Sequence, residues 1–254
     1  MTIRYLCKQH LITQMTVAEK IEKQINRMKE GTTFKYQELA IEKEEYSAAA
    51  KAIERLIKKG ALNRISTGVF YKAKKTLFGD LKPREEELLK PYLFEGNKRT
   101  AYISGTSLYN KMGLTTQVPK NIKVASRSKR VITKVGNVEV RPVKSYIEVT
   151  NDNFYLLELL DALKDFKRIP DLNKTTAIAN LLQKLVELAE TDIERIVKIA
   201  IKYPPRVRAF LGALLTMLNV KSAEQLKKSL NPLSAYEYGI NKEQLPTIKY
   251  WNIQ

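Results

Sequence analysis

Cysteine and histidine are nearly absent from this sequence, which holds one of each among 254 residues. A disulfide within the chain is therefore impossible, and a zinc site built from cysteine and histidine has too few ligands. Cys7 and His10 stand three residues apart in a polar segment, which favours an ordinary N-terminal extension over a nucleophile pair. Because helical spacing begins only at Thr16, and a start at Met15 would remove both residues, we expect residues 1–15 to carry little functional weight.

Long apolar runs are also missing. No segment approaches the roughly 20 apolar residues that span a bilayer. Lys8, Gln9 and His10 interrupt the apolar block that a secretory signal would need. With 44% apolar residues, ten glycines and nine prolines, the composition indicates a globular, helix-rich chain. We therefore expect a cytoplasmic protein without a membrane partner.

Recognisable catalytic motifs are absent as well. The sequence has no GxxxxGK[ST], GxGxxG or GxSxG pattern. Ser104–Ser107 is typical of a helix cap, and Glu85–Glu87 of a solvated helix start rather than a metal site. Glu139, with Arg141 and Lys144 nearby, faintly resembles a nuclease core but has no aspartate at a convincing spacing. We expect no enzyme activity, cofactor or metal, although a DNA-processing enzyme stays open as an alternative.

Positive charge is the most prominent feature present. The chain has 45 Lys and Arg against 27 Asp and Glu, a formal net charge of +18. Residues 1–79 hold 16 basic and 8 acidic residues, and residues 80–150 hold 14 and 7. Residues 151–254 are closer to balance, with 15 and 12. This distribution predicts a polyanionic partner for the first 150 residues, most simply nucleic acid.

The first eighty residues have the periodicity of three helices. The first extends from Thr16 to Gly31, and a brief one is expected over 36–40. The third covers 45–59, with a buried stripe and an opposite polar face. The stripe consists of Ala49, Ile53, Leu56 and Ile57, and the polar face of Ser47, Lys51, Glu54 and Lys58.

A hairpin follows the third helix directly. Gly60 is suited to the left-handed conformation that ends a helix. Residues 62–65 alternate, a turn covers 66–68, and residues 69–71 return as a second strand, with one of Phe70 and Tyr71 expected in the core. This order predicts a winged helix-turn-helix domain over residues 1–79, in which the third helix enters the major groove of double-stranded DNA.

The side chains expected to contact DNA lie on the third helix, on the hairpin and just beyond it. Basic residues of the hairpin are expected at phosphates, and the leading end of the helix at base edges. Glu44 and Glu45 oppose this interpretation mildly, although acids also suit a helix N-terminus. The predicted set is Lys35, Tyr46, Ser47, Lys51, Lys58, Arg64, Ser66, Thr67, Lys72, Lys74 and Lys75.

Residues 80–254 are expected to form a second domain. A helix over 84–93 is interrupted by Pro91, and Ser104 is positioned to cap a short helix over 106–112. Strands are predicted over 122–125 and 145–149, with a hairpin of 130–135 and 138–143 joined by Gly136 and Asn137. From Phe154 onward apolar stripes indicate helices, followed by an irregular tail. The predicted class is α+β: a winged helix, a small mixed α/β unit and a helical C-terminal region.

Two segments together resemble the AbiEi family, the antitoxins of type IV toxin-antitoxin systems that act in abortive phage infection. They are AIERLIKKGALNRISTGVFYK and AYISGTSLYNKMGLTTQVPKNIKVAS, and the resemblance covers roughly residues 16–220. It implies an N-terminal domain that binds inverted repeats in its own promoter, and a C-terminal domain, here residues 80–254, that neutralises a nucleotidyltransferase-like toxin. Whether that toxin is contacted directly stays open, as does a winged-helix regulator with an unrelated sensor or partner-binding domain.

Overall fold

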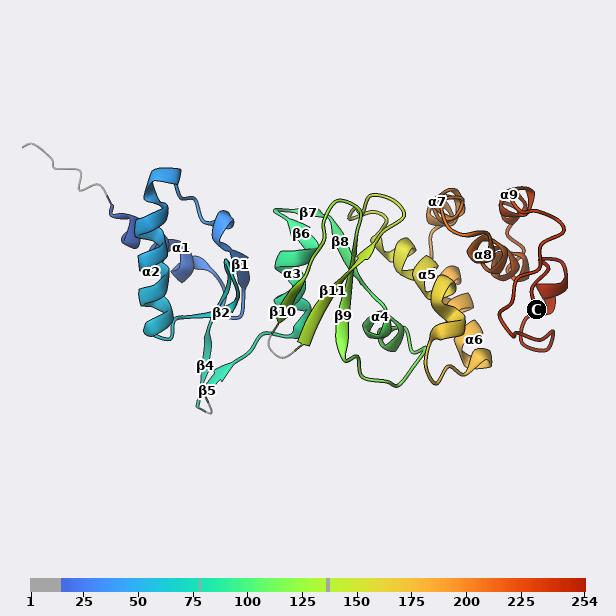
Figure 1. Cartoon of the computed structure of the whole chain (residues 1–254), viewed down its shortest axis with the longest axis horizontal. Helices are drawn as coiled ribbons and strands as arrows, with labels where there is room; N and C mark the ends of the chain where they lie inside the picture. The colour runs from blue at the N-terminus through green and yellow to red at the C-terminus, as the bar shows by residue number, and fades with distance from the viewer. Residues whose placement is uncertain (1–14, 78, 136–137) are drawn as a thin grey trace, which may run out of the picture. The chain divides into compact units, whose positions relative to one another are not determined.

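The computed structural model describes residues 15–77, 79–135 and 138–254 (Figure 1). Its mixture of helices and several small sheets confirms the α+β class. The chain divides into two compact units, unit 1 (Met1–Pro91) and unit 2 (Tyr92–Gln254). The boundary expected between residues 79 and 80 thus falls inside unit 1, within strand β5.

Unit 1 is built around a three-stranded antiparallel sheet with the order β1-β3-β2. Its elements are α1 (Val17–Arg27), β1 (Thr33–Lys35), η1 (Tyr36–Glu38), η2 (Lys43–Glu45), α2 (Tyr46–Lys58), β2 (Leu62–Ser66), β3 (Val69–Lys72), β4 (Lys74–Thr76) and β5 (Gly79–Leu81). The expected hairpin is confirmed as β2 and β3. The helix expected over 36–40 is only a single 3₁₀ turn, because Leu39 alone is buried there and one apolar contact does not support a longer helix.

Helix α2 has the amphipathic character that its sequence predicts. Ala49, Ile53 and Leu56 are buried in the core that α1, α2 and the sheet share. Ile57 is only partly buried at the edge of this core. Gly60 follows the helix at φ +70°, a conformation that is strained for residues with a Cβ atom, so the predicted glycine stop is confirmed.

Both faces of the unit 1 sheet are covered. Phe34 and Phe70 pack together on the face toward α1 and α2, with ring centroids 5.8 Å apart. Thr33 and Tyr71 are register partners and face the other way, where Thr33 contacts Glu87 of α3 (Glu85–Leu93). Because of this second layer Tyr71 is buried as well as Phe70, and the expectation that only one of them lies in the core was wrong.

Helix α3 continues through Pro91 to Leu93, so the predicted interruption at this proline is also wrong. Proline lacks the N–H that would bond to the carbonyl four residues earlier. That carbonyl belongs to Glu87, and it accepts a hydrogen bond from the Thr33 hydroxyl instead. The sheet therefore satisfies the group that Pro91 leaves without a helical partner.

Unit 2 contains a four-stranded sheet of order β10-β11-β9-β8, in which β9 and β11 are parallel, preceded by the separate strand pair β6–β7. Helices α4 (Thr106–Lys111) and α5 (Phe154–Asp165) lie on one side of it (Figure 1). The elements are β6 (Phe94–Glu95), β7 (Lys98–Arg99), β8 (Ala101–Ser104), α4 (Thr106–Lys111), β9 (Asn121–Ser126), β10 (Thr133–Val135) and β11 (Val138–Lys144). The expected hairpin is confirmed as β10 and β11, while its Gly136–Asn137 turn lies outside the described residues.

Two expectations for this region were wrong. Ser104 does not cap α4; it ends β8, and Gly105 at φ +73° precedes the helix without a side-chain cap. Residues 145–149 form no strand, because the Ser145 hydroxyl bonds to the carbonyl of Ile147 and bends the chain locally. Serine side chains compete with regular structure through such short-range bonds.

The rest of unit 2 is helical, as the apolar stripes predict. Its helices are α5 (Phe154–Asp165), η3 (Phe166–Arg168), α6 (Lys174–Val186), α7 (Glu190–Ala200), α8 (Pro205–Met217), α9 (Ala223–Lys228) and η4 (Pro246–Lys249). The final segment packs onto this core: Tyr236 and Ile253 form a bridge, and Trp251 is fully buried. Among the described residues, no helix combines the length and apolar character needed to cross a bilayer.

Candidate nucleic-acid interface

The outward face of α2 carries polar side chains at helical spacing. Ser47, Lys51, Glu54 and Lys58 are all exposed, on the side opposite the buried stripe. Arg55 is also exposed beside them. It was not predicted from the sequence, because it is adjacent to the apolar stripe. This surface can present two lysines and an arginine to a polyanion, with one glutamate among them.

The acidic residues at the start of α2 are partly neutralised. Glu45 accepts a hydrogen bond from the Lys20 ammonium at 2.8 Å, across to helix α1. That bond lowers the pKa of the Glu45 carboxyl, which therefore stays ionised and paired. Glu44 is exposed. The repulsion that these acids would exert on phosphate is thus reduced at one of the two positions.

Tyr46 stands at the first position of α2 and is 44% exposed. Its ring meets that of Tyr36 edge to face, with centroids 5.7 Å apart. The Tyr36 hydroxyl also donates to the main-chain carbonyl of Tyr46 at 2.8 Å. The turn η1 thereby fixes the leading end of α2, which is where a recognition helix needs a defined orientation.

The turn between β2 and β3 gathers several of the predicted residues at one end of the sheet. Ser66 and Lys35 are both register neighbours of Val69, so they flank the central strand. Thr67 is exposed in the turn, and Arg64 is exposed over the Phe70 ring at 5.6 Å. Lys35, Ser66 and Thr67 therefore lie at the same end of the sheet.

The Lys72 ammonium is bonded within unit 1. Its ammonium donates to the main-chain carbonyls of Asn26 at 3.0 Å and Met28 at 2.8 Å. These carbonyls lie at the end of α1, where the helix leaves acceptors unsatisfied. Lys72 therefore ties α1 to the end of β3, and its expected phosphate contact stays a prediction.

Lys74 and Lys75 lie just beyond β3, on a second pair of strands. They belong to β4, which pairs with β5 (Figure 1). Both side chains are exposed. The predicted DNA-contacting set is thus divided among the face of α2, the β2–β3 turn and this separate β4–β5 hairpin.

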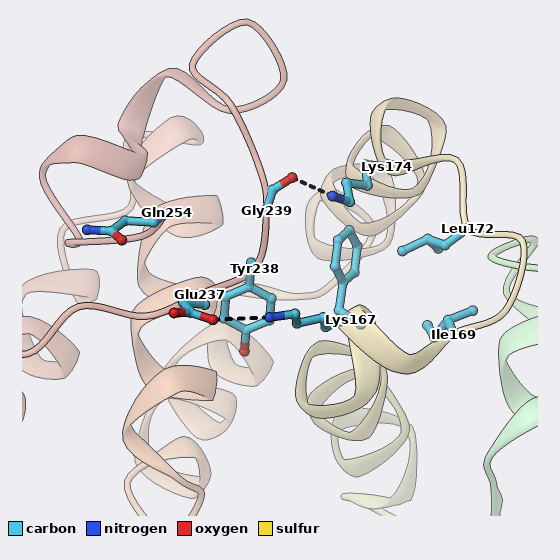
Figure 2. Close-up of a pocket in the computed structure, with 9 residues that line it drawn as sticks. Lys167, Ile169, Leu172, Lys174, Glu237, Tyr238, Gly239 and Gln254 are labelled. Carbon is cyan, nitrogen blue, oxygen red and sulfur yellow. Dashed lines mark hydrogen bonds and ion pairs between the residues drawn. The ribbon is translucent and has the colours of Figure 1, made fainter.

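A pocket of about 510 Å³ in unit 2 also contains lysines, but they are already bonded. Figure 2 shows Lys167 reaching the Glu237 carboxylate and Lys174 reaching the Gly239 carbonyl, at 3.2 and 2.5 Å. The Tyr238 side chain forms part of the lining. Because both ammonium groups have acceptors, this pocket offers little free positive charge to an anion.

Unit 2 also contains a buried polar cluster that was not predicted from the sequence. Asp161 is 1% exposed and accepts from the hydroxyls of Tyr102 at 3.0 Å and Ser104 at 2.7 Å, and from Lys164 at 2.5 Å. Burial and the neighbouring aspartate raise the pKa of Tyr102, which stays protonated as a donor. Because the Asp161 carboxylate accepts hydrogen bonds from two side chains of β8, it joins this strand to α5.

Groups that suggest metal or nuclease chemistry are few. Within residues 15–77, 79–135 and 138–254, no three Asp, Glu, His or Cys residues gather closely enough to hold a metal. Glu139 forms an ion pair with Arg141 at 2.8 Å on the surface of β11. Cys7 and His10 lie outside the described residues.

Comparison with known proteins gives a family and a fold. Residues 20–187, more than half of the chain, match a family of unknown function, DUF6088. The chain belongs to this family. No curated protein matches this chain. Among solved structures, the crystal structure of the RV2827C protein from Mycobacterium tuberculosis is similar, with a TM-score of 0.53 and 12% identity over 86% of this chain and 83% of that one. At this identity the likeness extends to the fold alone.

Proposed function

We propose that this DUF6088 protein is a DNA-binding autorepressor and antitoxin of a type IV toxin-antitoxin system. Unit 1 acts as a winged helix-turn-helix that recognises inverted repeats in its own promoter, and unit 2 neutralises a nucleotidyltransferase-like toxin. Neither activity requires a cofactor or makes the protein an enzyme.

The proposal is supported above all by the outward face of α2. This helix exposes Ser47, Lys51 and Lys58, packs its apolar stripe on α1, and leads through Gly60 straight into a hairpin. Strand β2 of that hairpin also contacts α2, an arrangement that fits a winged helix with α2 as its recognition helix. Helix and hairpin then contact base edges and phosphates respectively.

Quantitative DNA binding tests the proposal. The full chain should bind its own upstream DNA far more tightly than random duplex, since specific sites typically gain 10³-fold or more. Equal affinity for both would contradict sequence-specific recognition. Co-expression with the product of the neighbouring gene should suppress any growth arrest that this product causes. Suppression should persist in the double variant Lys51→Ala, Lys58→Ala, because neutralisation is assigned to unit 2.

A further inference from the structure

A second pocket, of about 500 Å³, lies wholly within unit 1. It is formed by the loop after α1, the β4–β5 hairpin and the beginning of α3. Five basic side chains line it, together with Glu30 and Glu87. The basic residues are Lys29, Lys74, Lys82, Arg84 and Lys90.

With five basic and two acidic side chains, the pocket lining has a formal net charge of +3. The Glu87 carboxylate accepts a hydrogen bond from the Thr33 main-chain N–H at 3.4 Å and forms an ion pair with Lys90 at 3.6 Å. Among the described residues, no ion pair or side-chain hydrogen bond is found for Lys29, Lys82 or Arg84. Like charges that converge from three separate segments repel one another, and an anion bound among them removes that repulsion.

The pocket lies away from the face proposed to bind DNA. Its α3 wall covers the sheet face that carries Thr33 and Tyr71, whereas α2 covers the face that carries Phe70. It also adjoins the end of β3 near Lys72, where Gly31 bonds to the Lys72 carbonyl, and not the Thr67 turn at the other end. A ligand held here leaves the outward face of α2 accessible.

We propose that this pocket binds a small polyphosphate, either free or carried by a nucleotide. Its volume is within the range of small-molecule sites and exceeds what a single phosphate fills. Lysine and arginine are the side chains that hold linked phosphate groups, through charge-assisted hydrogen bonds. Lys74, which the sequence analysis assigns to DNA contact, also lines this pocket.

Calorimetric titration of the full chain with inorganic tripolyphosphate, at about 0.15 M salt to screen the overall charge, tests the proposal. The pocket variant Lys29→Ala, Lys82→Ala, Arg84→Ala should weaken binding roughly tenfold or more, since it removes three charge-assisted contacts. The matched control Lys51→Ala, Arg55→Ala, Lys58→Ala also loses two lysines and one arginine, all exposed, and should bind tripolyphosphate like the parent.

Equal weakening in both variants would overturn the proposal, because it would show attraction by net charge alone. So would a pocket variant that binds tripolyphosphate normally, or one that loses duplex DNA affinity as much as tripolyphosphate affinity. A parallel titration with ATP shows whether the polyphosphate is free or carried by a nucleotide. If ATP binds more tightly than tripolyphosphate, the ligand is a nucleotide. If the two bind equally, the pocket recognises only the phosphate chain. The control variant tests the α2 face separately. If the protein turns out not to bind DNA specifically, the tripolyphosphate result for the pocket variant still stands.

Discussion

The hydroxyl group of Thr33 donates a hydrogen bond to the main-chain carbonyl of Glu87 at 2.7 Å. Pro91 has no N–H to offer this carbonyl, so strand β1 supplies the donor that helix α3 lacks. Thr33 is only 7% exposed, and loss of the donor would leave an acceptor unsatisfied in a nearly closed site.

Thr33→Val should therefore lower the free energy of unfolding by about 1–3 kcal/mol, as expected when a buried polar group loses its partner. Valine keeps the shape and the strand preference of threonine, so the change isolates the hydroxyl. Urea denaturation followed by circular dichroism measures it. Thr32→Val, one residue earlier, is the control and should change stability little. Equal effects at both positions would show that the bond to Glu87 is not the cause.

Lys72→Met should destabilise unit 1 without altering its electrostatic attraction to DNA. The ammonium bonds to the Asn26 and Met28 carbonyls, and bonds to charged groups contribute roughly 1.5–3 kcal/mol each. We expect a lower midpoint in urea, while the slope of log K against log salt stays unchanged. A slope that becomes shallower by about 0.9 would mean that Lys72 contacts a phosphate.

Lys51→Ala should weaken operator binding by roughly 1–3 kcal/mol and random DNA much less, because its side chain lies on the outward face of α2. Filter binding on both DNAs gives the comparison. Glu54→Ala, on the same face, is the control and should not weaken binding, because it removes a negative charge. A uniform loss on both DNAs with Lys51→Ala would assign this lysine to the phosphate backbone instead.

Gly212→Ala should destabilise unit 2, although alanine ordinarily stabilises a helix interior by roughly 0.5–1 kcal/mol relative to glycine. A Cβ atom at this position of α8 would lie 2.2 Å from the Trp251 ring, which is fully buried. Overpacking of this kind typically costs about 1–3 kcal/mol, or more where the neighbour cannot move. A double-mutant cycle tests this by thermal unfolding of Gly212→Ala, Trp251→Leu and the double variant. If the stability changes of the two single variants add up to that of the double variant, a steric clash between residues 212 and 251 is excluded.

The stability of unit 2 should fall as pH rises from about 5 to about 7. Burial raises the pKa of Glu158 from 4.5 to about 7, against the opposing pull of Lys111 and Arg99. In that interval the folded state retains a proton that the unfolded state has released, so unfolding becomes easier with increasing pH and levels off above 7. Glu158→Gln should flatten this dependence in urea titrations at several pH values. An unchanged dependence would assign it to another group.

Local periodicity determined much of unit 1 in advance. The spacing of Ala49, Ile53 and Leu56 sets the buried side of α2, and therefore places Ser47 and Lys51 outside, whatever the helix packs against. In unit 2 the apolar stripes were sufficient to predict the helices, because burying an amphipathic face requires the same periodicity in any fold.

Side-chain roles between distant segments were decided only by the tertiary structure. Lys72 and Lys74 are two residues apart and look alike in the sequence, yet one satisfies the carbonyls at the end of α1 and the other lines a basic pocket. Asp161, in an apolar helix, gave no local sign of the hydroxyls that it binds. A sequence specifies which face of an element is buried through its own spacing, whereas the partner of a polar group depends on which remote segment packs there. The register and packing of whole elements determine that partner.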